Sequence, residues 1–228
     1  MYIYELHQHT SAVSACAVDT PEDIVRGLKA AGFAGVVMTE HFYHGNTALR
    51  RHQAWEDFVR PYEQAYERAK KAAEGLDFDV LFGIEEGVGG GKEVLIYGIT
   101  PAFLYAHPEL REMRLPALSA LVREAGGVVV QAHPFRVRDY IPAPWEELPA
   151  EHLDGVEVYN ACNDDLSNLR ALGLAERLGG IAIAGSDSHS LSSLGQAGIA
   201  CERRIRTEQE LVDLLRSGDY ELYTNDGE

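Results

Sequence analysis

The chain has few cysteines and no long apolar run. Its 228 residues include only three cysteines, Cys16, Cys162 and Cys201. They are too few and too dispersed for a disulfide framework, which indicates a reducing compartment. No apolar run approaches the length of a membrane span, and His7 and His9 fall where the apolar part of a signal peptide would lie. We therefore expect a cytoplasmic protein without membrane contact.

Basic residues are also scarce relative to acidic ones. Lys and Arg number 20 against 36 Asp and Glu, which gives a net charge of -16. A broad nucleic-acid surface needs a basic face, so nucleic acid is a disfavoured partner. A small phosphorylated ligand is not excluded, because metal ions and an arginine can dominate a single cavity. The length suits one α/β barrel, and no linker divides residues 1–228, so we expect a single domain.

Predicted strands and helices alternate along the chain, which favours a parallel sheet or barrel. The first helix is predicted to follow Thr20, a suitable N-cap, with Pro21 in its first turn. A longer helical region covers about residues 49–74, where Pro61 predicts a break or a second start. Residues 220–223 are expected to form a closing strand.

Histidines and carboxylates follow several segments that have the composition of buried strands. They are His7 and His9 after residues 2–6, His41 after 34–39, Glu85 after 80–84, His133 after 127–132, and Asp187 and His189 after 181–184. Because the carboxyl ends of parallel barrel strands meet at one mouth, we expect these side chains to be neighbours. Imidazole with carboxylate is a ligand set for zinc, manganese or iron. The sequence therefore predicts a metal-dependent hydrolase.

Two pairs within this set have the spacing of ligands on a strand. His7 and His9 are separated by one residue, as are Asp187 and His189. Residues i and i+2 of a strand share a face, so each pair could reach one ion. Alone, the spacing of the first pair would also fit a surface strand end, but its position at the end of the first strand, beside the other clusters, favours the ligand interpretation. A helix cap would explain Asp187, but it would leave the following histidine unexplained.

The remaining candidate ligands leave alternatives open. Glu85 could bridge two ions, and strand parity favours it over Glu86, although the two could be exchanged. Glu93 begins the next predicted strand and is either a ligand or a solvated strand start. Cys16 lies in a loop that we place opposite the mouth. Its thiolate would suit zinc, but an isolated cysteine is usually a small buried hydrophobe, and Asp19 competes for the same role.

Three side chains are placed near the mouth by their neighbours in the sequence. His133 precedes Pro134, which favours an extended conformation that would hold the ring at the mouth. Arg136 could present a fork of donors to a phosphate, or it could form an ordinary surface salt bridge. His44 is close enough to His41 to line a pocket.

Together these segments resemble the PHP superfamily, named for polymerase and histidinol phosphatase. The resemblance rests on ELHQHT at 5–10, TEH at 39–41, GIE at 83–85, QAHPFR at 131–136 and GSDSH at 185–189. Their order and spacing extend over nearly the whole chain. The resemblance implies an α/β fold, a distorted (β/α)7 TIM-like barrel. It also implies two or three divalent ions, Zn²⁺, Mn²⁺ or Fe²⁺, at the strand mouth.

The resemblance further implies a ligand set. One metal would be held by His7, His9, Glu85 and Asp187, a second by Glu85 and His133, and a third by His41 and His189. Two positions depart from the family pattern. Cys16 falls where the third metal commonly has His or Asp, which leaves that metal's identity or presence open. Glu93 replaces a usual His, which favours a harder ion such as manganese at the second metal. Asn160, in a further similar segment, would line the pocket.

The implied activity is metal-dependent hydrolysis of a small phosphomonoester or a nucleotide. Two ions bridged by Glu85 would share a hydroxide that attacks phosphorus in line, with Asp187 holding the first ion. Arg136 would neutralise the phosphate, and His189 or a bound water would protonate the leaving oxygen. The alternatives are a 3′–5′ nuclease of the same fold, hydrolysis of an amide or lactone, and a non-catalytic metal-binding or sensor domain. The sequence leaves the oligomeric state open.

Overall fold

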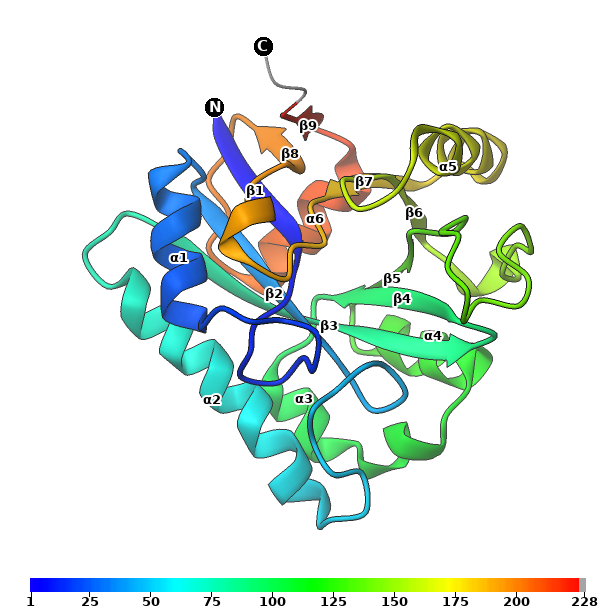
Figure 1. The fold of residues 1–228 in the computed structure, drawn as a ribbon, viewed down its shortest axis with the longest axis horizontal. Helices are drawn as coiled ribbons and strands as arrows, with labels where there is room; N and C mark the ends of the chain where they lie inside the picture. The colour runs from blue at the N-terminus through cyan, green and yellow to red at the C-terminus, as the bar shows by residue number, and fades with distance from the viewer. Residues whose placement is uncertain (226–228) are drawn as a thin grey trace.

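The sheet of this protein curls into a nearly closed barrel (Figure 1). The structure is a computed structural model that describes residues 1–225. The strands are β1 (Tyr2–Gln8), β2 (Gly35–His41), β3 (Asp79–Gly89), β4 (Lys92–Tyr97), β5 (Val128–Ala132), β6 (Gly155–Asn160), β7 (Ile181–Gly185), β8 (Ala197–Cys201) and β9 (Glu221–Thr224). They are ordered β7-β6-β5-β4-β3-β2-β1-β8-β9, and a parallel bridge between Gln8 and Ser188 brings the end of β7 to β1. The predicted TIM-like α/β barrel is confirmed.

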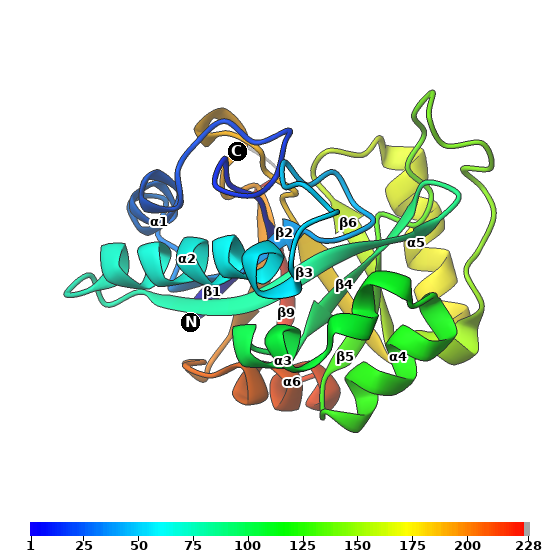
Figure 2. The same ribbon diagram turned by 90° about the horizontal axis from the view of Figure 1, so that it is seen from below.

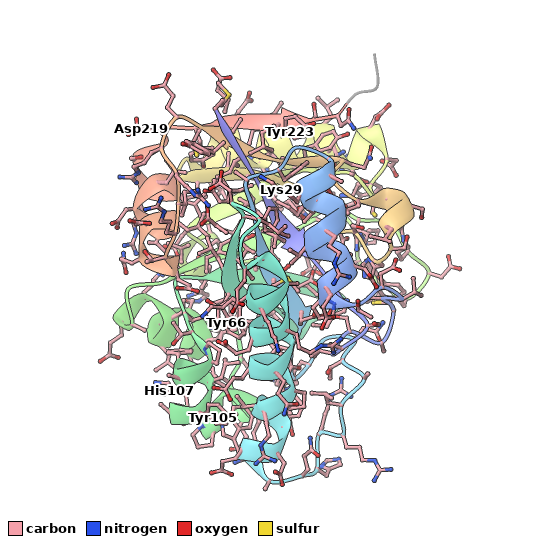
Figure 3. The ribbon with its side chains drawn as sticks, turned by 90° about the vertical axis from the view of Figure 1, so that its left-hand side faces the viewer. Lys29, Tyr66, Tyr105, His107, Asp219 and Tyr223 are labelled. Carbon is pink, nitrogen blue, oxygen red and sulfur yellow. The ribbon has the colours of Figure 1, made fainter. Side chains whose placement is uncertain are left out.

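Helices cover the outside of the barrel (Figure 2). They are α1 (Pro21–Ala30), α2 (Trp55–Ala73), α3 (Pro101–Ala106), α4 (Leu115–Glu124), α5 (Asp165–Leu178) and α6 (Glu208–Ser217). Helix α2 runs down the face shown in Figure 3, where the hydroxyl of Tyr66 donates to Glu208 of α6 over 2.9 Å. Among residues 1–225, no helix is both long enough and apolar enough to cross a membrane.

The helix signals of the sequence have two different outcomes. The side chain of Thr20 accepts a hydrogen bond from the backbone N–H of Asp23, which confirms the predicted start of α1. Pro61 lies inside α2 and does not interrupt it, so the predicted break is wrong. A proline in a helix interior costs about 3 kcal/mol. Phe58 and Tyr62, on both sides of Pro61, are buried in one cluster, and this packing outweighs the cost.

The sheet is mixed where the sequence favoured a parallel one. Strands β1, β2 and β3 are parallel, and so are β5, β6 and β7, but β4 runs antiparallel between β3 and β5. Gly89, Gly90 and Gly91 make the reversal with φ values of 100°, 62° and 74°, which other residues adopt at a cost. An antiparallel strand begins where its partner ends. Glu93 therefore pairs with Gly87 beyond Glu85, at the mouth.

The two C-terminal strands extend the sheet beyond β1. Strand β8, which the sequence analysis did not predict, pairs antiparallel with β1. The predicted closing strand forms β9, and it pairs with β8. A buried cluster joins strands around the barrel to α6 and includes Tyr4, Leu81, Tyr97, Ile183 and Leu211. This core supports the polar strand ends from below.

Candidate functional site

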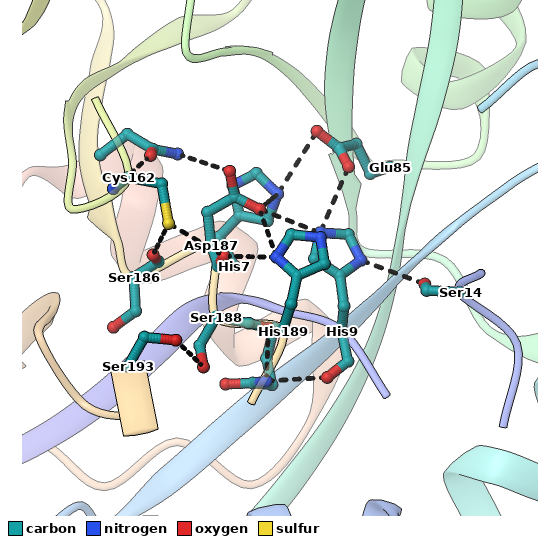
Figure 4. A network of polar contacts seen from close by, with 12 residues as sticks. His7, His9, Ser14, Glu85, Cys162, Ser186, Asp187, Ser188, His189 and Ser193 are labelled. Carbon is teal, nitrogen blue, oxygen red and sulfur yellow. Dashed lines mark hydrogen bonds and ion pairs between the residues drawn. The ribbon is translucent and has the colours of Figure 1, made fainter. Parts of the chain in front are cut away.

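The structure brings the predicted metal-binding side chains to one mouth of the barrel. Figure 4 shows His7, His9, Glu85, Asp187 and His189 among them. Four groups have ligand atoms within 4.8 Å of one another: His7, His9 and Glu85; His7, His133 and Asp187; His41, Glu85 and Glu93; His9, His41 and His189. Cys16 belongs to none of these groups, but it lines the same cavity as His41 and His189. The grouped residues lie in or directly after β1, β2, β3, β4, β5 and β7, so the barrel unites groups that are distant in sequence.

Glu85, on β3, lies at the centre of the cluster. Its Oε1 is 2.8 Å from Nε2 of His133 and 3.3 Å from Nε2 of His7. Its Oε2 is 2.8 Å from Nδ1 of His41 and 3.3 Å from Nε2 of His9. Each oxygen therefore faces its own pair of imidazoles, which is the arrangement that a carboxylate bridging two ions requires.

One carboxylate oxygen of Asp187 faces the cluster, and the other binds Arg136. Its Oδ1 is 3.2 Å from Nε2 of His9 and 3.5 Å from Nε2 of His7. Its Oδ2 accepts a hydrogen bond from Nη2 of Arg136. Asp187 has a φ of 52°, in the sparsely populated left-handed region. Such backbone strain persists where the surrounding structure holds it, and it is common at functional sites.

Hydrogen bonds behind the cluster orient two of its histidines. The Nδ1–H group of His7 donates to Oε1 of Glu157 over 2.8 Å. The hydroxyl of Ser14 donates to Glu40 over 2.5 Å, so Ser14 Oγ accepts from Nδ1 of His9 over 3.2 Å. In both rings Nε2 then carries the lone pair. Carboxylate–histidine pairs of this kind fix the tautomer of metal-binding histidines.

Several buried atoms of the cluster have no hydrogen-bond partner within residues 1–225. They are Nε2 of His7, Nε2 of His9, Nδ1 of His41 and Oε2 of Glu85. Native proteins rarely leave buried polar atoms unsatisfied without a bound ion or water. These nitrogen and oxygen atoms face one another and are of the kind that coordinates metals. A single divalent cation, or a pair, would therefore satisfy them together. The donor set therefore fits a metal centre.

The electrostatics of the cluster also favour a cation. Burial would raise the pKa of Glu85, but the imidazoles of His7 and His41 hold it well below its usual value. The pKa of Asp187 is likewise held low, against burial, by His7 and Arg136. Burial and the charge of Glu85 raise the pKa of Glu93 to about 8. A bound cation would relieve this repulsion between neighbouring carboxylates.

Cys16 does not lie opposite the mouth, so that expectation is wrong. It lines the cavity at the mouth, because its loop folds back over the barrel end. The backbone N–H of Val18 donates to the carbonyl of His189 over 3.0 Å and holds the loop there. The competing candidate Asp19 instead accepts from the backbone N–H of Leu191 over 2.6 Å.

Strand parity separates the two neighbouring glutamates as the sequence suggested. Glu85 points into the cluster, whereas Glu86 accepts from the backbone N–H of His44 over 3.1 Å and contacts its ring over 2.5 Å.

The expectation for the backbone of His133 was less accurate. Its φ is 26°, a positive value, so the extended conformation predicted from Pro134 is wrong. The backbone N–H of His133 donates to Glu157 over 2.8 Å, and this contact helps to hold that conformation.

A cavity of about 700 Å³ opens beside the cluster. Its lining includes the candidate ligands and the predicted His44 together with cationic side chains: Cys16, His41, His44, Glu93, Asp187, His189, Lys92, Arg136 and Arg138. Lys92 donates to the carbonyls of Pro134 and Pro144 over 2.7 and 2.8 Å and ties the start of β4 to that segment. The cavity thus has local positive charge although the chain is strongly acidic.

The predicted substrate contacts Arg136 and Asn160 differ in position. Arg136 lines the cavity, and its Nη2 donates to Asn160 over 3.0 Å and to Asp187. Its Nε donates to Asn163 over 3.2 Å, which leaves Nη1 without a partner in the described part of the chain. Asn160 is fully buried and lies outside the cavity lining, so the expectation that it lines the pocket is wrong. Its amide instead donates to Glu157 over 3.0 Å, and the carboxylate of Glu157 lies behind the mouth.

The sequence analysis missed Glu157, Ser14 and Glu40 as functional candidates. All three are buried and support the histidines rather than face the cavity. The signal for Glu157 was a charged residue between two valines in an apolar strand, since a buried carboxylate needs partners. Ser14 carried no signal, because its position in the loop gives no register.

We expect Glu157→Gln to lower metal affinity by about 10- to 100-fold, as is typical for partners behind metal ligands. Oε2 of Glu157 accepts from the backbone N–H of His133 and from Asn160, so an amide NH₂ at this position would face two donors. Titration of the metal-free protein with a metal indicator measures the change. Glu176→Gln, at an exposed position on α5, is the matched control. Equal affinities in the two variants would contradict this role.

Comparison with protein families supports the fold assignment. A family model described as PHP-associated matches residues 165–220, which include Asp187 and His189. Comparison with proteins of curated function gave no significant match.

Several solved structures share the fold. A protein from Bifidobacterium adolescentis, assigned as a metal-dependent phosphoesterase, is 18% identical with a TM-score of 0.56, over 93% of this chain and 96% of that one. A two-domain protein from Bacteroides vulgatus, with a predicted PHP-like metal-dependent phosphoesterase, is 15% identical with a TM-score of 0.67, over 98% and 64%. A lesion-specific endonuclease from Pyrococcus furiosus is 12% identical with a TM-score of 0.65, over 97% and 57%. This chain therefore spans less than two thirds of the length of the Bacteroides and Pyrococcus proteins.

Proposed function

We propose that this chain is a member of the PHP superfamily, that it is a metal-dependent hydrolase of phosphoric esters, and that it acts on a small phosphomonoester or a nucleotide; the family model and the shared fold support this. One observation carries the proposal: buried nitrogen and oxygen atoms of His7, His9, His41 and Glu85 face one another but form no hydrogen bond among residues 1–225. Such an arrangement is costly in a metal-free protein, and a divalent ion makes it favourable.

The geometry suggests which residues would hold the ions. His7, His9, Glu85 and Asp187 would hold one ion, and Glu85, His133 and Glu93 a second. When bound, divalent ions supply a Lewis acid and a water of lowered pKa. Glu85 serves both sites through its two oxygens. His7 and Arg136 hold the pKa of Asp187 well below its usual value against burial, which favours its carboxylate form as a ligand.

Cationic side chains in the cavity lining support a phosphate as the ligand. Nη1 of Arg136 remains available in the cavity, because its other nitrogens bind Asn160, Asn163 and Asp187. Arg138 lines the same cavity and donates to the carbonyl of Cys162 over 3.0 Å, which restrains its exposed guanidinium. Guanidinium groups match phosphate oxygens in geometry and charge.

His189 was predicted to protonate the leaving oxygen. Its Nδ1–H group donates to the carbonyl of Asp187 over 2.8 Å, so Nε2 carries the lone pair. His189 also lies among the candidate ligands with His9 and His41. An imidazole whose lone pair binds an ion has no proton to donate from that nitrogen, so we assign the leaving-group proton to water.

A substrate panel tests the proposal. The protein is loaded with Mn²⁺ or Zn²⁺ and offered sugar phosphates, nucleoside monophosphates, single-stranded DNA, lactones and amides. We expect turnover on phosphomonoesters and none on the carbonyl substrates. Turnover confined to DNA would replace the proposal with a nuclease, and turnover of lactones or amides would replace it with a carbonyl hydrolase. Full metal loading without any turnover would point to a non-catalytic metal-binding domain.

We expect Arg138→Gln to raise KM for phosphorylated substrates several-fold with little change in kcat. Arg138 lines the rim and does not contact the candidate ligands, so it would contribute to binding by about 1 kcal/mol. Steady-state kinetics measure the two constants. Arg170→Gln is the control, since Arg170 stacks on Trp145 outside the cavity lining. A fall in kcat at constant KM would assign Arg138 a different role.

A further inference from the structure

Helix α5 presents apolar side chains to solvent as well as to the core. On its inner face, Ala171 and Leu174 are buried in a cluster with valines of β6. Its outer face is also rich in leucine, and the exposed residues are Leu166, Leu169, Leu172 and Leu178. No other α-helix among residues 1–225 carries an exposed large apolar side chain. Contiguous exposed apolar surface of this kind marks an interaction site.

The exposed surface continues from α5 into the segment 133–149, which follows β5. Figures 1 and 2 show α5 at the outer edge of the molecule, beside this segment. The guanidinium carbon of Arg170 on α5 lies 4.2 Å from the centre of the Trp145 ring, and Trp145 is itself exposed. Arg177 near the end of α5 donates to Glu147. The outer face of α5 and this segment therefore form one surface that is larger than a single helix.

A narrow stripe runs along the outer face of α5. Residues three and four positions apart lie on one side of a helix, so Leu166, Leu169 and Gly173 form this stripe. Glycine is costly inside a helix. Within the described chain, a Cβ added at Gly173 would meet no atom outside the helix backbone closer than Nη1 of Arg177, at 3.8 Å. A glycine in this uncrowded position leaves room for the backbone of a second helix to approach.

Two opposite charges flank the stripe. Asp165 and Arg170 are five residues apart, which puts them roughly 140° apart around the helix and on opposite sides of the stripe. They cannot reach each other, and neither side chain forms a hydrogen bond or ion pair with another residue of the described chain. In two parallel helices related by a two-fold axis, the acidic side of each helix meets the basic side of the other. In an antiparallel pair, sides of like charge would meet.

We propose that two copies of this chain associate through the outer face of α5, with the two helices parallel and Asp165 of each copy opposite Arg170 of the other. A second copy is the occupant that this surface fits, because it supplies the same leucines together with both complementary charges. The five residues Asp165, Leu166, Leu169, Arg170 and Gly173 lie outside the cavity lining. The proposal is therefore independent of the proposed function.

Substitution of the stripe tests the association. Masses are measured by analytical ultracentrifugation at physiological ionic strength, which screens the net charge of -16. We expect a dimer of the wild-type protein at micromolar concentration, and Leu169→Asp should raise its dissociation constant at least roughly 30-fold. Val18→Asp is the matched control, because Val18 is 70% exposed and Leu169 66%, and it should keep the dimer. Circular dichroism verifies that each variant is folded.

A monomeric wild-type protein would overturn the proposal. So would a dimer that survives Leu169→Asp, or one that is lost equally in Val18→Asp. Wild-type protein that stays monomeric but sediments with phosphatidylcholine vesicles would assign the face to a lipid surface instead.

A charge exchange tests the parallel arrangement of the two helices. Asp165→Arg and Arg170→Asp should each weaken the dimer about 10-fold, because each places like charges opposite one another twice in the assembly. The double variant should recover the wild-type dissociation constant. A mixture of the two single variants should form heterodimers, since each copy then offers the charge that the other lacks. Failure of both rescues would overturn the parallel arrangement.

Discussion

Glu85→Gln is expected to reduce phosphoester turnover by roughly 10³-fold, equivalent to about 4 kcal/mol of transition-state stabilisation. Glu85 is fully buried, and its two oxygens face four imidazoles from the ends of β1, β2 and β5. Glutamine keeps the shape but offers one neutral acceptor and one NH₂ donor. It would therefore fail to bridge two ions, and the loss should appear both in kcat and in the number of ions bound.

The neighbouring residue makes this experiment specific. Glu86 is also buried, but its carboxylate binds His44 instead of entering the cluster. Glu86→Gln therefore removes the same charge one residue away, and it should keep the metal content of the wild-type protein. Elemental analysis and steady-state kinetics are compared for the two variants. Wild-type turnover and metal content in Glu85→Gln would contradict the central role of Glu85.

Chelation is expected to lower the melting temperature by roughly 10 °C. An ion that binds only the folded protein at a thousand times its dissociation constant stabilises it by about 4 kcal/mol. In a domain of this size, each kcal/mol shifts the melting temperature by roughly 2–4 °C. Removal of the ions also leaves the carboxylates of Glu85, Glu93 and Asp187 close together without a cation between them. Thermal unfolding followed by circular dichroism, with and without chelator, measures the shift.

The variants again provide the controls for this shift. Glu85→Gln should show a smaller difference between the metal-loaded and chelated states, because it binds fewer ions. Glu86→Gln should show the same difference as the wild-type protein. Restoring Mn²⁺ or Zn²⁺ should recover the original melting temperature. Equal melting temperatures in the two states of the wild-type protein would indicate that the mouth binds no ion strongly.

Much of the barrel and the identity of the clustered side chains followed from local patterns. His7 and His9 are one residue apart at a strand end, and strand geometry alone puts both on one face. The alternation of apolar strands with helices favoured a barrel, and Thr20 marked the start of its first helix. These features depend on neighbours in the sequence, so they can be predicted without knowledge of the distant contacts.

Other features depended on contacts that the sequence does not display. The reversal of β4 brings Glu93 to the mouth, and only the pairing of β4 with both β3 and β5 settles its direction. The position of Cys16 depends on a loop held to His189, a residue more than 170 positions away in the chain. Loops have no regular register, so their direction is set by long-range hydrogen bonds rather than by local propensity.

The sequence by itself determined which chemical groups this protein could use, because the strand ends and their parity are local properties. Only the tertiary structure decided which of these groups face the cluster, which support the histidines from behind and which line the cavity. It turned Glu157 and Ser14 towards the backs of His7 and His9, and it placed Asn160 behind Arg136 instead of in the cavity. The physical reason is that buried polar atoms must find partners, and those partners come from strands that meet only when the barrel closes.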